Sequence, residues 1–310
     1  MNSLVGWARH GASGTEINNR DFGSYVCVPA EHHLRGDRME QRFDPNQASQ
    51  TRAIESVTDL LAGQPRIEIE PSLALGTGPA VFPNVLDLAV PNRLDLDDTA
   101  LLANLQSVQQ RNDLSPDPAL LCIEGSIETV EGSKQARFQN FSVEMGTGTG
   151  KIYVYLRTAL ELYRRYGMRK FIVVVPSVAI CEGALKVMRM SERHLLDLYR
   201  NPAYRYFVYD PKAPSQVRQF ALSDGVEIMV MTVDSFSRAS NIFTQTTDCL
   251  QGETSLDLVQ AVRPILILDE PQNMESERRV RALSVLDPLF ALRYSAAHRN
   301  PYNVVYRLTP

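Results

Sequence analysis

One glycine-rich run constrains the fold of this chain more than any other: Met145-Gly146-Thr147-Gly148-Thr149-Gly150-Lys151-Ile152. It follows an apolar stretch and opens an amphipathic one. In loops of the pattern G-x-x-x-x-G-K-[ST], glycines turn backbone N–H groups toward phosphates, a lysine meets the β and γ charges, and a hydroxyl binds magnesium. The run therefore predicts a nucleotide-binding loop between a strand and a helix, formed by Thr147, Gly148, Thr149, Gly150, Lys151 and Ile152.

The loop departs from this pattern at two positions. Ile152 stands where a serine or threonine hydroxyl is expected, and Met145 stands at the first glycine position. The phosphate-binding groups, Gly148, Gly150 and Lys151, are all present. The sequence thus supports phosphate binding more strongly than it supports metal binding.

Composition limits the protein class without deciding function. A chain of 310 residues with 44% hydrophobic content is long enough for one large α/β domain, alone or with an extension. A net charge of -4 and a pI near 5.8 indicate no overall electrostatic attraction to nucleic acid. Any DNA contact must therefore come from a local cationic face.

Cysteine usage and hydropathy predict a soluble cytoplasmic protein with no membrane partner. The four cysteines lie far apart and form no C-x-x-C pair, so neither a zinc site nor a disulfide framework is indicated. No apolar run approaches the roughly 18 residues of a membrane span. The N-terminus also lacks the apolar core of a secretory signal.

The N-terminal half predicts three regions. Residues 1–38 show no periodicity and are expected to be disordered or a spurious extension, with Met39 as a possible true start. Residues 39–65 are expected to hold one helix, over about 46–62, which ends at a Gly and Pro stop signal. Residues 66–140 are expected to form a family-specific insertion with a helix around 98–111.

Residues 141–310 alternate between strand and helix patterns. A strand is predicted over 141–145 and a helix from Lys151 to about Tyr166, which Gly167 closes. The later predicted strands are 171–175, 204–209, 226–232, 265–268 and 292–295. This alternation predicts an α/β fold, a RecA-like doubly wound parallel sheet, with ligands at the carboxyl ends of its strands.

Two carboxylates follow the most apolar of these strands. Asp269 at the strand tip is expected to be catalytic and to hold Mg²⁺, and Glu270 to position and deprotonate a water, with Lys151 as the third catalytic group. A strand-to-helix capping pair is the alternative for a strand-Asp-Glu sequence taken alone. The phosphate-binding loop earlier in the chain favours the catalytic interpretation.

An amide at the entrance of the first helix is a candidate base reader. The side chain of Gln50 can satisfy both the donor and the acceptor of an adenine edge, which would select ATP over GTP. A capping or surface role for Gln50 remains an alternative of similar weight.

Polar residues after other strands predict a DNA-binding edge. Pro176 and Ser177 offer a hydroxyl and backbone amides at a helix start, which suits a nucleic-acid phosphate, although this signal is weak by itself. Ser235 and the run from Ser295 to His298 follow later strands on the same edge. His298 taken alone could be a polar loop residue.

Together these segments resemble the first motor domain of a superfamily-two helicase of the DEAD/DEAH type, and more narrowly the Res subunit of type III restriction-modification enzymes. The resemblance covers about 40–310 and rests on the following segments: FDPNQASQ from Phe43, FSVEMGTGTGK from Phe141, YGMRKFIVVVPSVAICEG from Tyr166, YFVYD from Tyr206, DEPQ from Asp269 and DPLFALRYSAAH from Asp287. It implies ATP and Mg²⁺ as cofactors, a helicase-like hydrolase that moves or switches on double-stranded DNA, and a DNA-methyltransferase partner. It also implies that Gln272, Ser295 and His298 couple ATP to DNA, and that Pro176, Ser177 and Ser235 contact DNA.

The sequence departs from the family pattern in ways that leave two functions open. Gly146 replaces a glutamate, Ile152 a threonine, and Ala297 a threonine of the usual Ser-Ala-Thr-His box. The chain is expected to be truncated before the second motor domain and the nuclease domain. Because an arginine finger from a second domain contributes about 10³ to 10⁵ in rate, this chain alone is expected to be nearly inactive.

Two hypotheses therefore remain. In the first, the chain is the ATPase portion of a DNA-translocating restriction subunit. In the second, it is a truncated or decayed homologue that binds nucleotide or the methyltransferase without turnover. A generic P-loop kinase fits poorly, because the DEPQ and SAAH boxes have no place in one.

Overall fold

The structure is a computed structural model that describes residues 44–68, 85–129, 132–236, 252–298 and 300–308. These residues belong to one compact unit, Gln41–Pro310. The expectations for residues 1–38 lie outside the described residues. So does Phe43, the first residue of the segment that precedes the first helix.

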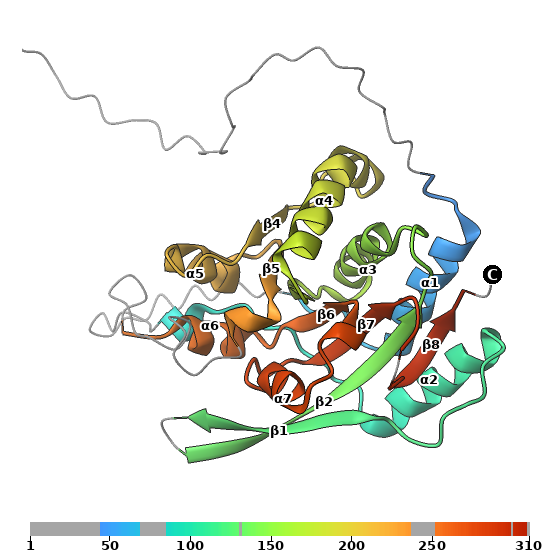
Figure 1. The fold of residues 1–310 in the computed structure, drawn as a ribbon, viewed down its shortest axis with the longest axis horizontal. Coiled ribbons are helices and arrows are strands. Elements are labelled where there is room, and N and C mark those ends of the chain that lie inside the picture. The colour runs from blue at the N-terminus through green and yellow to red at the C-terminus, as the bar shows by residue number, and fades with distance from the viewer. Residues whose placement is uncertain (1–43, 69–84, 130–131, 237–251, 299, 309–310) are drawn as a thin grey trace, which may run out of the picture. The chain divides into compact units, whose positions relative to one another are not determined.

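A mostly parallel sheet forms the centre of the described chain (Figure 1). Its strand order is β1-β2-β7-β6-β3-β5-β4, and β8 pairs with β2 beside this path. Only the β1–β2 pair within this sheet is antiparallel. The strands are β1 Cys122–Thr129, β2 Gly132–Glu144, β3 Lys170–Val175, β4 Tyr204–Val208, β5 Val226–Thr232, β6 Ile265–Asp269, β7 Phe290–Ser295 and β8 Asn303–Arg307. The predicted doubly wound α/β fold is confirmed.

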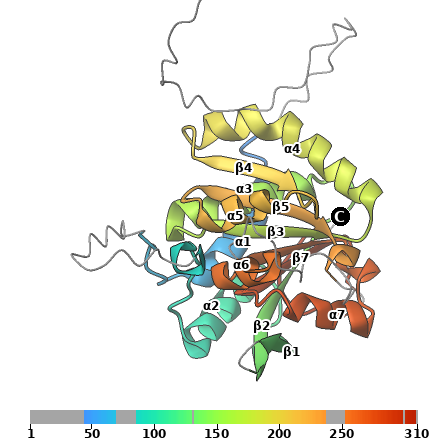
Figure 2. The same cartoon turned by 90° about the vertical axis from the view of Figure 1, so that its left-hand side faces the viewer.

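Helices cover both faces of the sheet (Figure 2). The α-helices are α1 Ala48–Thr58, α2 Asp98–Arg111, α3 Lys151–Tyr166, α4 Val178–Leu198, α5 Pro214–Leu222, α6 Ser255–Val262 and α7 Glu277–Ser284. Alternate residues of β3 enter two cores because side chains alternate across a strand: Phe171 and Val173 pack with α1 to α4, and Ile172 and Val174 with α5 to α7. Burial on both faces explains why the central strands read as continuous apolar runs.

Several helix boundaries agree with the sequence signals. Helix α1 continues into a 3₁₀ turn, Asp59–Leu61, so that helical structure covers most of the predicted 46–62. Helix α2 coincides with the helix expected around 98–111, and the Asp97 side chain caps it by accepting from the Ala100 N–H. Helix α3 has the predicted bounds, and Gly167 closes it in the left-handed region with φ 73°.

The strand predicted over 141–145 is the end of a much longer strand. Strand β2 begins at Gly132, and its first half pairs with β1 while Phe141 to Glu144 pair with β8 on the same side. The early residues of β2 are exposed, so they lack the apolar run that marks the central strands. Because of this exposure, the β1–β2 hairpin is not recognisable from the sequence.

Candidate functional site

The glycine-rich loop connects β2 to α3 with two glycines in the left-handed backbone region. Gly148 has φ +82° and Gly150 has φ +85°, conformations that glycine adopts without steric cost. A Cβ on Gly150 would also lie 2.6 Å from Nε2 of Gln50. The Thr149 hydroxyl donates to the Gly146 carbonyl at 2.7 Å, which closes the loop on itself. The loop is therefore already folded, with Gly150 at the N-terminus of α3.

Gln50 holds this loop from α1. Its Nε2 donates to the Thr149 carbonyl at 2.9 Å, although the two residues are far apart in sequence. The side chain is buried, with 8% exposed. The amide donor of Gln50 is thus hydrogen-bonded to the loop, a contact that the sequence did not predict.

The strand-tip carboxylates lie next to the loop. Asp269 ends β6 and is 3% exposed. Glu270 adopts a left-handed conformation, φ 52° and ψ 54°, while its N–H donates to the Tyr294 carbonyl of β7 at 3.0 Å. Such a conformation is costly for a residue with a side chain, and it persists only where neighbouring contacts enforce it. Here it directs Glu270 toward the loop, where Oε1 lies 2.5 Å from Nζ of Lys151.

The two adjacent carboxylates have opposite pKa shifts. Burial and, after it, the negative charge of Glu270 raise the pKa of Asp269 to about 6, although the charge of Lys151 acts to lower it. Burial also acts to raise the pKa of Glu270, but the hydrogen bonds and charge of Lys151, with Gln272 and Ser295, bring it below its usual value. Glu270 is therefore ionised near neutral pH, and Asp269 gains a proton more easily than an ordinary aspartate.

A hydrogen-bonded series connects Glu270 to the end of β7. The Gln272 amide donates to Oε2 of Glu270 at 2.7 Å, and the Ser295 hydroxyl donates to Oε1 of Gln272 at 2.7 Å. The Ser295 oxygen also accepts from the Ala297 N–H at 3.3 Å. Two of the three predicted coupling residues are therefore brought together with the carboxylate.

His298 lies outside this series. It faces Arg293, Glu144 and Glu275, and burial together with the charge of Arg293 lowers its pKa. His298 also does not line the cavity next to the glycine-rich loop. Among the described residues, no hydrogen bond joins the His298 ring to Gln272 or Ser295.

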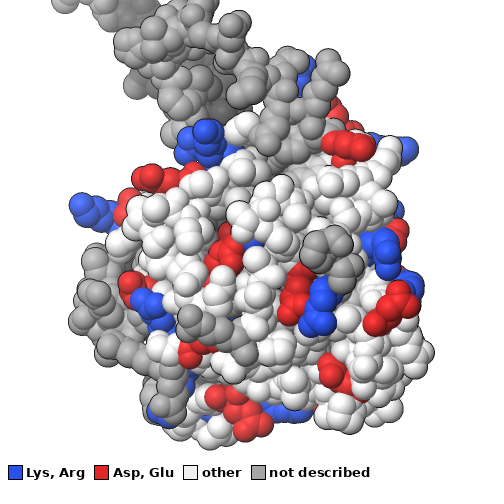
Figure 3. Space-filling view, turned by 45° about the vertical axis from the view of Figure 1, so that its right-hand side comes forward, with Lys and Arg blue, Asp and Glu red and all other residues white. Residues whose placement is uncertain are grey.

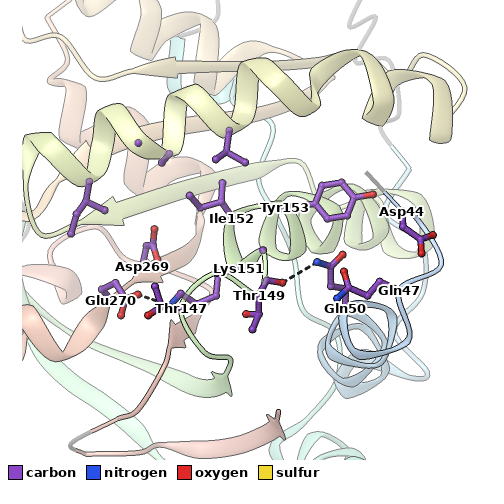
Figure 4. A pocket seen from close by; sticks show the side chains of 16 residues that line it. Asp44, Gln47, Gln50, Thr147, Thr149, Lys151, Ile152, Tyr153, Asp269 and Glu270 are labelled. Carbon is purple, nitrogen blue, oxygen red and sulfur yellow. Dashed lines mark hydrogen bonds and ion pairs between the residues drawn. The ribbon is translucent and has the colours of Figure 1, made fainter. Parts of the chain in front are cut away.

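A cavity of about 620 Å³ opens above the loop (Figure 4). All of the predicted nucleotide-binding residues and both strand-tip carboxylates line it: Gln50, Thr147, Gly148, Thr149, Gly150, Lys151, Ile152, Asp269 and Glu270. Four residues of α4 form an apolar wall of this cavity, namely Ile180, Gly183, Ala184 and Val187. The sequence analysis did not assign these residues to the site, although their i, i+3, i+4, i+7 spacing is that of one helix face. Asp44, Gln47 and Tyr153 complete the lining.

Ile152 occupies the hydroxyl position and lines the cavity. It is half-buried and packs against the larger hydrophobic core. Figure 4 shows it between Asp269 and the side chains of α4. An isoleucine offers no oxygen ligand, so Asp269 is the carboxylate left for a metal ion while Glu270 is paired with Lys151.

The predicted DNA-contacting residues lie at neighbouring strand ends, outside the cavity. Ser177 is exposed and caps α4, where its side chain accepts from the Ile180 N–H at 3.4 Å, and Pro176 precedes it. The Ser235 hydroxyl lies 2.9 Å from that of Thr232, which ends β5. Because Val175 of β3 and Thr232 of β5 are register partners, these residues share one edge of the sheet.

Three further observations concern the surface charges, metal-binding clusters and helices of the described residues. On the face shown in Figure 3, the described acidic and basic side chains are interspersed over a largely uncharged surface. Among the described residues there is no cluster of three or more His, Cys, Asp or Glu that could hold a metal ion by itself. None of the described helices is long and apolar enough to cross a membrane.

Known proteins are similar to this chain over more than half of its length. Residues 100–299 match the family described as type III restriction enzyme, res subunit. The chain is 29% identical over 250 residues to the EcoP15I Res subunit of Escherichia coli and 27% identical over 242 residues to the EcoPI Res subunit of Escherichia phage P1. These matches cover 73% and 72% of this chain, but only 25% and 24% of those relatives.

A solved structure described as the Sulfolobus solfataricus SWI2/SNF2 ATPase core in complex with dsDNA aligns with a TM-score of 0.34 and 13% identity. It covers 51% of this chain and 27% of that one. The family match extends over more than half of the 310 residues and includes both the glycine-rich loop and the Asp269-Glu270 pair. The chain belongs to the Res-subunit family of type III restriction enzymes.

Proposed function

We propose that this chain is the ATP-binding motor portion of a type III restriction subunit, a DNA-dependent ATPase that acts on double-stranded DNA with a methyltransferase partner in the cytoplasm. The observation that carries the proposal is the Lys151–Glu270 ion pair inside a cavity walled by the phosphate-binding loop. A lysine for the β and γ phosphates and a carboxylate for water activation are two of the charged groups that such hydrolysis uses.

The residues around the cavity divide between the parts of the nucleotide. The loop amides of Thr147 to Gly150 and the Lys151 ammonium would hold the phosphates. Gln50, with Gln47 beside it in the lining, would read the adenine edge. Glu270, once released from Lys151, would hold and deprotonate the attacking water.

The residues at this site fit Mg²⁺, but they lack the Ser or Thr hydroxyl ligand of the usual loop pattern. Proteins bind this ion through one or two carboxylates together with substrate phosphates and waters, and Asp269 offers a buried carboxylate at the cavity. Asp269 would hold Mg²⁺ at the cavity, where the ion would supply positive charge against the phosphates. Ile152 contributes no ligand.

DNA would bind along the sheet edge outside the cavity. Ser177 offers a hydroxyl and exposed amides at the start of α4, and Ser235 lies beyond the neighbouring strand. The Gln272 and Ser295 contacts would carry a change at Glu270 toward the region after β7, where His298 lies.

A second function is favoured by Ile152. Without the hydroxyl ligand, the chain would bind nucleotide or the methyltransferase without turnover. The chain spans about a quarter of the length of the EcoP15I and EcoPI relatives, so activities of the whole subunit are part of the proposal.

Two measurements on the purified chain test these functions. Titration with ATP, ADP and GTP, with Lys151→Ala as the variant, should give adenine-selective binding that the variant loses. Phosphate release with and without double-stranded DNA then separates the two functions, because DNA-stimulated release supports the ATPase and binding without release supports the second function. Equal binding of ATP by wild type and Lys151→Ala would contradict nucleotide binding at the glycine-rich loop, and with it the proposed ATPase.

A further inference from the structure

One buried tyrosine lies under the metal side of the cavity and has no part in the proposed function so far. Tyr155 follows the glycine-rich loop by one turn of α3 and is fully buried. Its ring packs edge-on against Tyr294 of β7, with ring centroids 5.7 Å apart. Tyr294 is in turn the register partner of Asp269 on the neighbouring strand β6.

Sheet geometry brings Tyr155 and Asp269 to the same place. Register partners on adjacent parallel strands project to the same face, so Asp269 and Tyr294 point to the face that α3 covers. The hydroxyl of Tyr294 donates to that of Thr158 at 3.2 Å, also on α3. Tyr155 thus enters the layer between α3 and the tip of β6 where Asp269 lies.

The Tyr155 hydroxyl has no hydrogen-bond partner within the described part of the chain. Buried hydroxyls are normally bonded, and leaving one unpaired lowers stability. Tyr294 beside it satisfies this rule through Thr158. The hydroxyls of Tyr199 and Tyr204 also have no partner in the described part of the chain, but only Tyr155 of the three packs against Tyr294, the register partner of Asp269. Burial raises the pKa of Tyr155, and the charge of Asp269 comes first among the neighbouring groups that raise it further.

We propose that Tyr155 is a positioning residue for the metal-binding carboxylate, and that its hydroxyl donates a hydrogen bond to Asp269 when nucleotide and Mg²⁺ are bound. One carboxylate oxygen is then held from below by Tyr155, and the other faces the cavity. This inference rests on the proposed function, since it assigns the support of the Mg²⁺ ligand.

The requirement for such support follows from the neighbouring residues. Ile152 offers no oxygen, and the proposed function assigns Glu270 to the attacking water once nucleotide releases it from Lys151. Asp269 is then the one carboxylate left for the metal ion, and its orientation decides whether the ion is held. Hydrogen bonds behind a ligand typically change metal affinity by about 10- to 100-fold.

The test compares Tyr155→Phe with Tyr294→Phe, each of which removes one buried hydroxyl and keeps the ring. The Tm without ligand and the Kd for ADP in EDTA and in excess Mg²⁺ are measured for each variant. Tyr155→Phe should keep or raise Tm, because an unpaired hydroxyl is removed. It should also keep the Kd in EDTA and reduce the improvement that Mg²⁺ brings by about 10-fold. Tyr294→Phe should lower Tm, because it loses the bond to Thr158, and should keep the full effect of Mg²⁺.

Other results overturn the inference in distinguishable ways. If Tyr155→Phe keeps the wild-type effect of Mg²⁺, whatever its Tm, Tyr155 is a core residue only. If Tyr294→Phe loses the Mg²⁺ effect equally, the loss does not belong to the Tyr155 hydroxyl. Wild-type binding that ignores Mg²⁺ overturns the positioning role and leaves nucleotide binding standing, whereas no wild-type binding at all refutes the proposed function as well.

Discussion

The ammonium of Lys151 lies 2.5 Å from the carboxylate of Glu270. The group expected to bind phosphate therefore forms an ion pair with the group expected to activate water. On the proposed function, a nucleotide that enters the cavity would draw Lys151 away. That movement frees Glu270 on the side opposite Gln272, which holds its other oxygen. The ion pair therefore links nucleotide entry to the exposure of the candidate base.

Glu270→Gln should separate binding from hydrolysis. The neutral amide no longer holds Lys151 by charge, so ADP affinity should stay equal or rise by up to about 5-fold, the range of a partly exposed ion pair. Hydrolysis should fall to background because the base is lost. Calorimetric titration and phosphate release measure the two effects, and Glu161→Gln serves as a control that neutralises an ion-paired carboxylate of α3 outside the cavity. Weaker ADP binding by Glu270→Gln would contradict competition between Glu270 and phosphate for Lys151.

Ile152→Thr should restore the missing hydroxyl at the cavity. We expect the improvement in nucleotide affinity on adding Mg²⁺ to increase by roughly 10-fold, because an oxygen ligand joins Asp269. Ile152→Val is the matched control, since valine has the shape of threonine without the hydroxyl. The measurement is the Kd for ADP with EDTA and with Mg²⁺. An equal gain in both variants would assign the effect to side-chain size.

Gln50→Glu tests whether the amide of α1 serves both the loop and the base. The Nε2 donor to the Thr149 carbonyl is lost, and a carboxylate oxygen is placed against that carbonyl, so the loop should loosen and Tm should fall. If Gln50 also reads the adenine edge, the ratio of ATP to GTP affinity should fall toward one. Gln47→Glu is the control, because that side chain lines the same cavity and no bond from it to the loop is seen among the described residues. A fall in Tm with unchanged selectivity would leave Gln50 with a structural role alone.

The sequence predicted the residues that line the cavity better than it predicted the contacts among them. Central strands such as β3 and β6 are recognisable because both of their faces are buried, and the loop is recognisable by its glycines. The β1–β2 hairpin was missed because its exposed residues show no apolar run. The engagement of Gln50 with Thr149 joins distant segments, and no local pattern indicates such a contact.

The same limit applies to Glu270 and His298. The left-handed backbone of Glu270 is imposed by the β7 carbonyl of Tyr294 and by Lys151, neither of which is near it in sequence. His298 follows Ser295 closely in the chain, yet Ser295 turns toward Gln272 while His298 faces Arg293. The sequence therefore predicted that the loop after β7 lies near the site, but it did not predict which way the Ser295 and His298 side chains point.

Asp269→Asn should make the free chain more stable at neutral pH, while it removes the metal ligand. Burial raises the pKa of Asp269 from 3.8 to about 6, so the folded chain holds a proton that the unfolded chain has lost between these values. The free energy of unfolding must then fall as pH rises through this window, and below about pH 4 the ionised aspartate no longer weakens the fold. The upper limit of the effect is about 3 kcal/mol at pH 7, from a shift of about two pKa units. Denaturant unfolding of wild type and Asp269→Asn from pH 4.5 to 7.5 measures it, with excess stability in the variant that should grow through pH 6 and then level off. A difference that stays constant across this range would show that Asp269 is not held in an environment that opposes its charge.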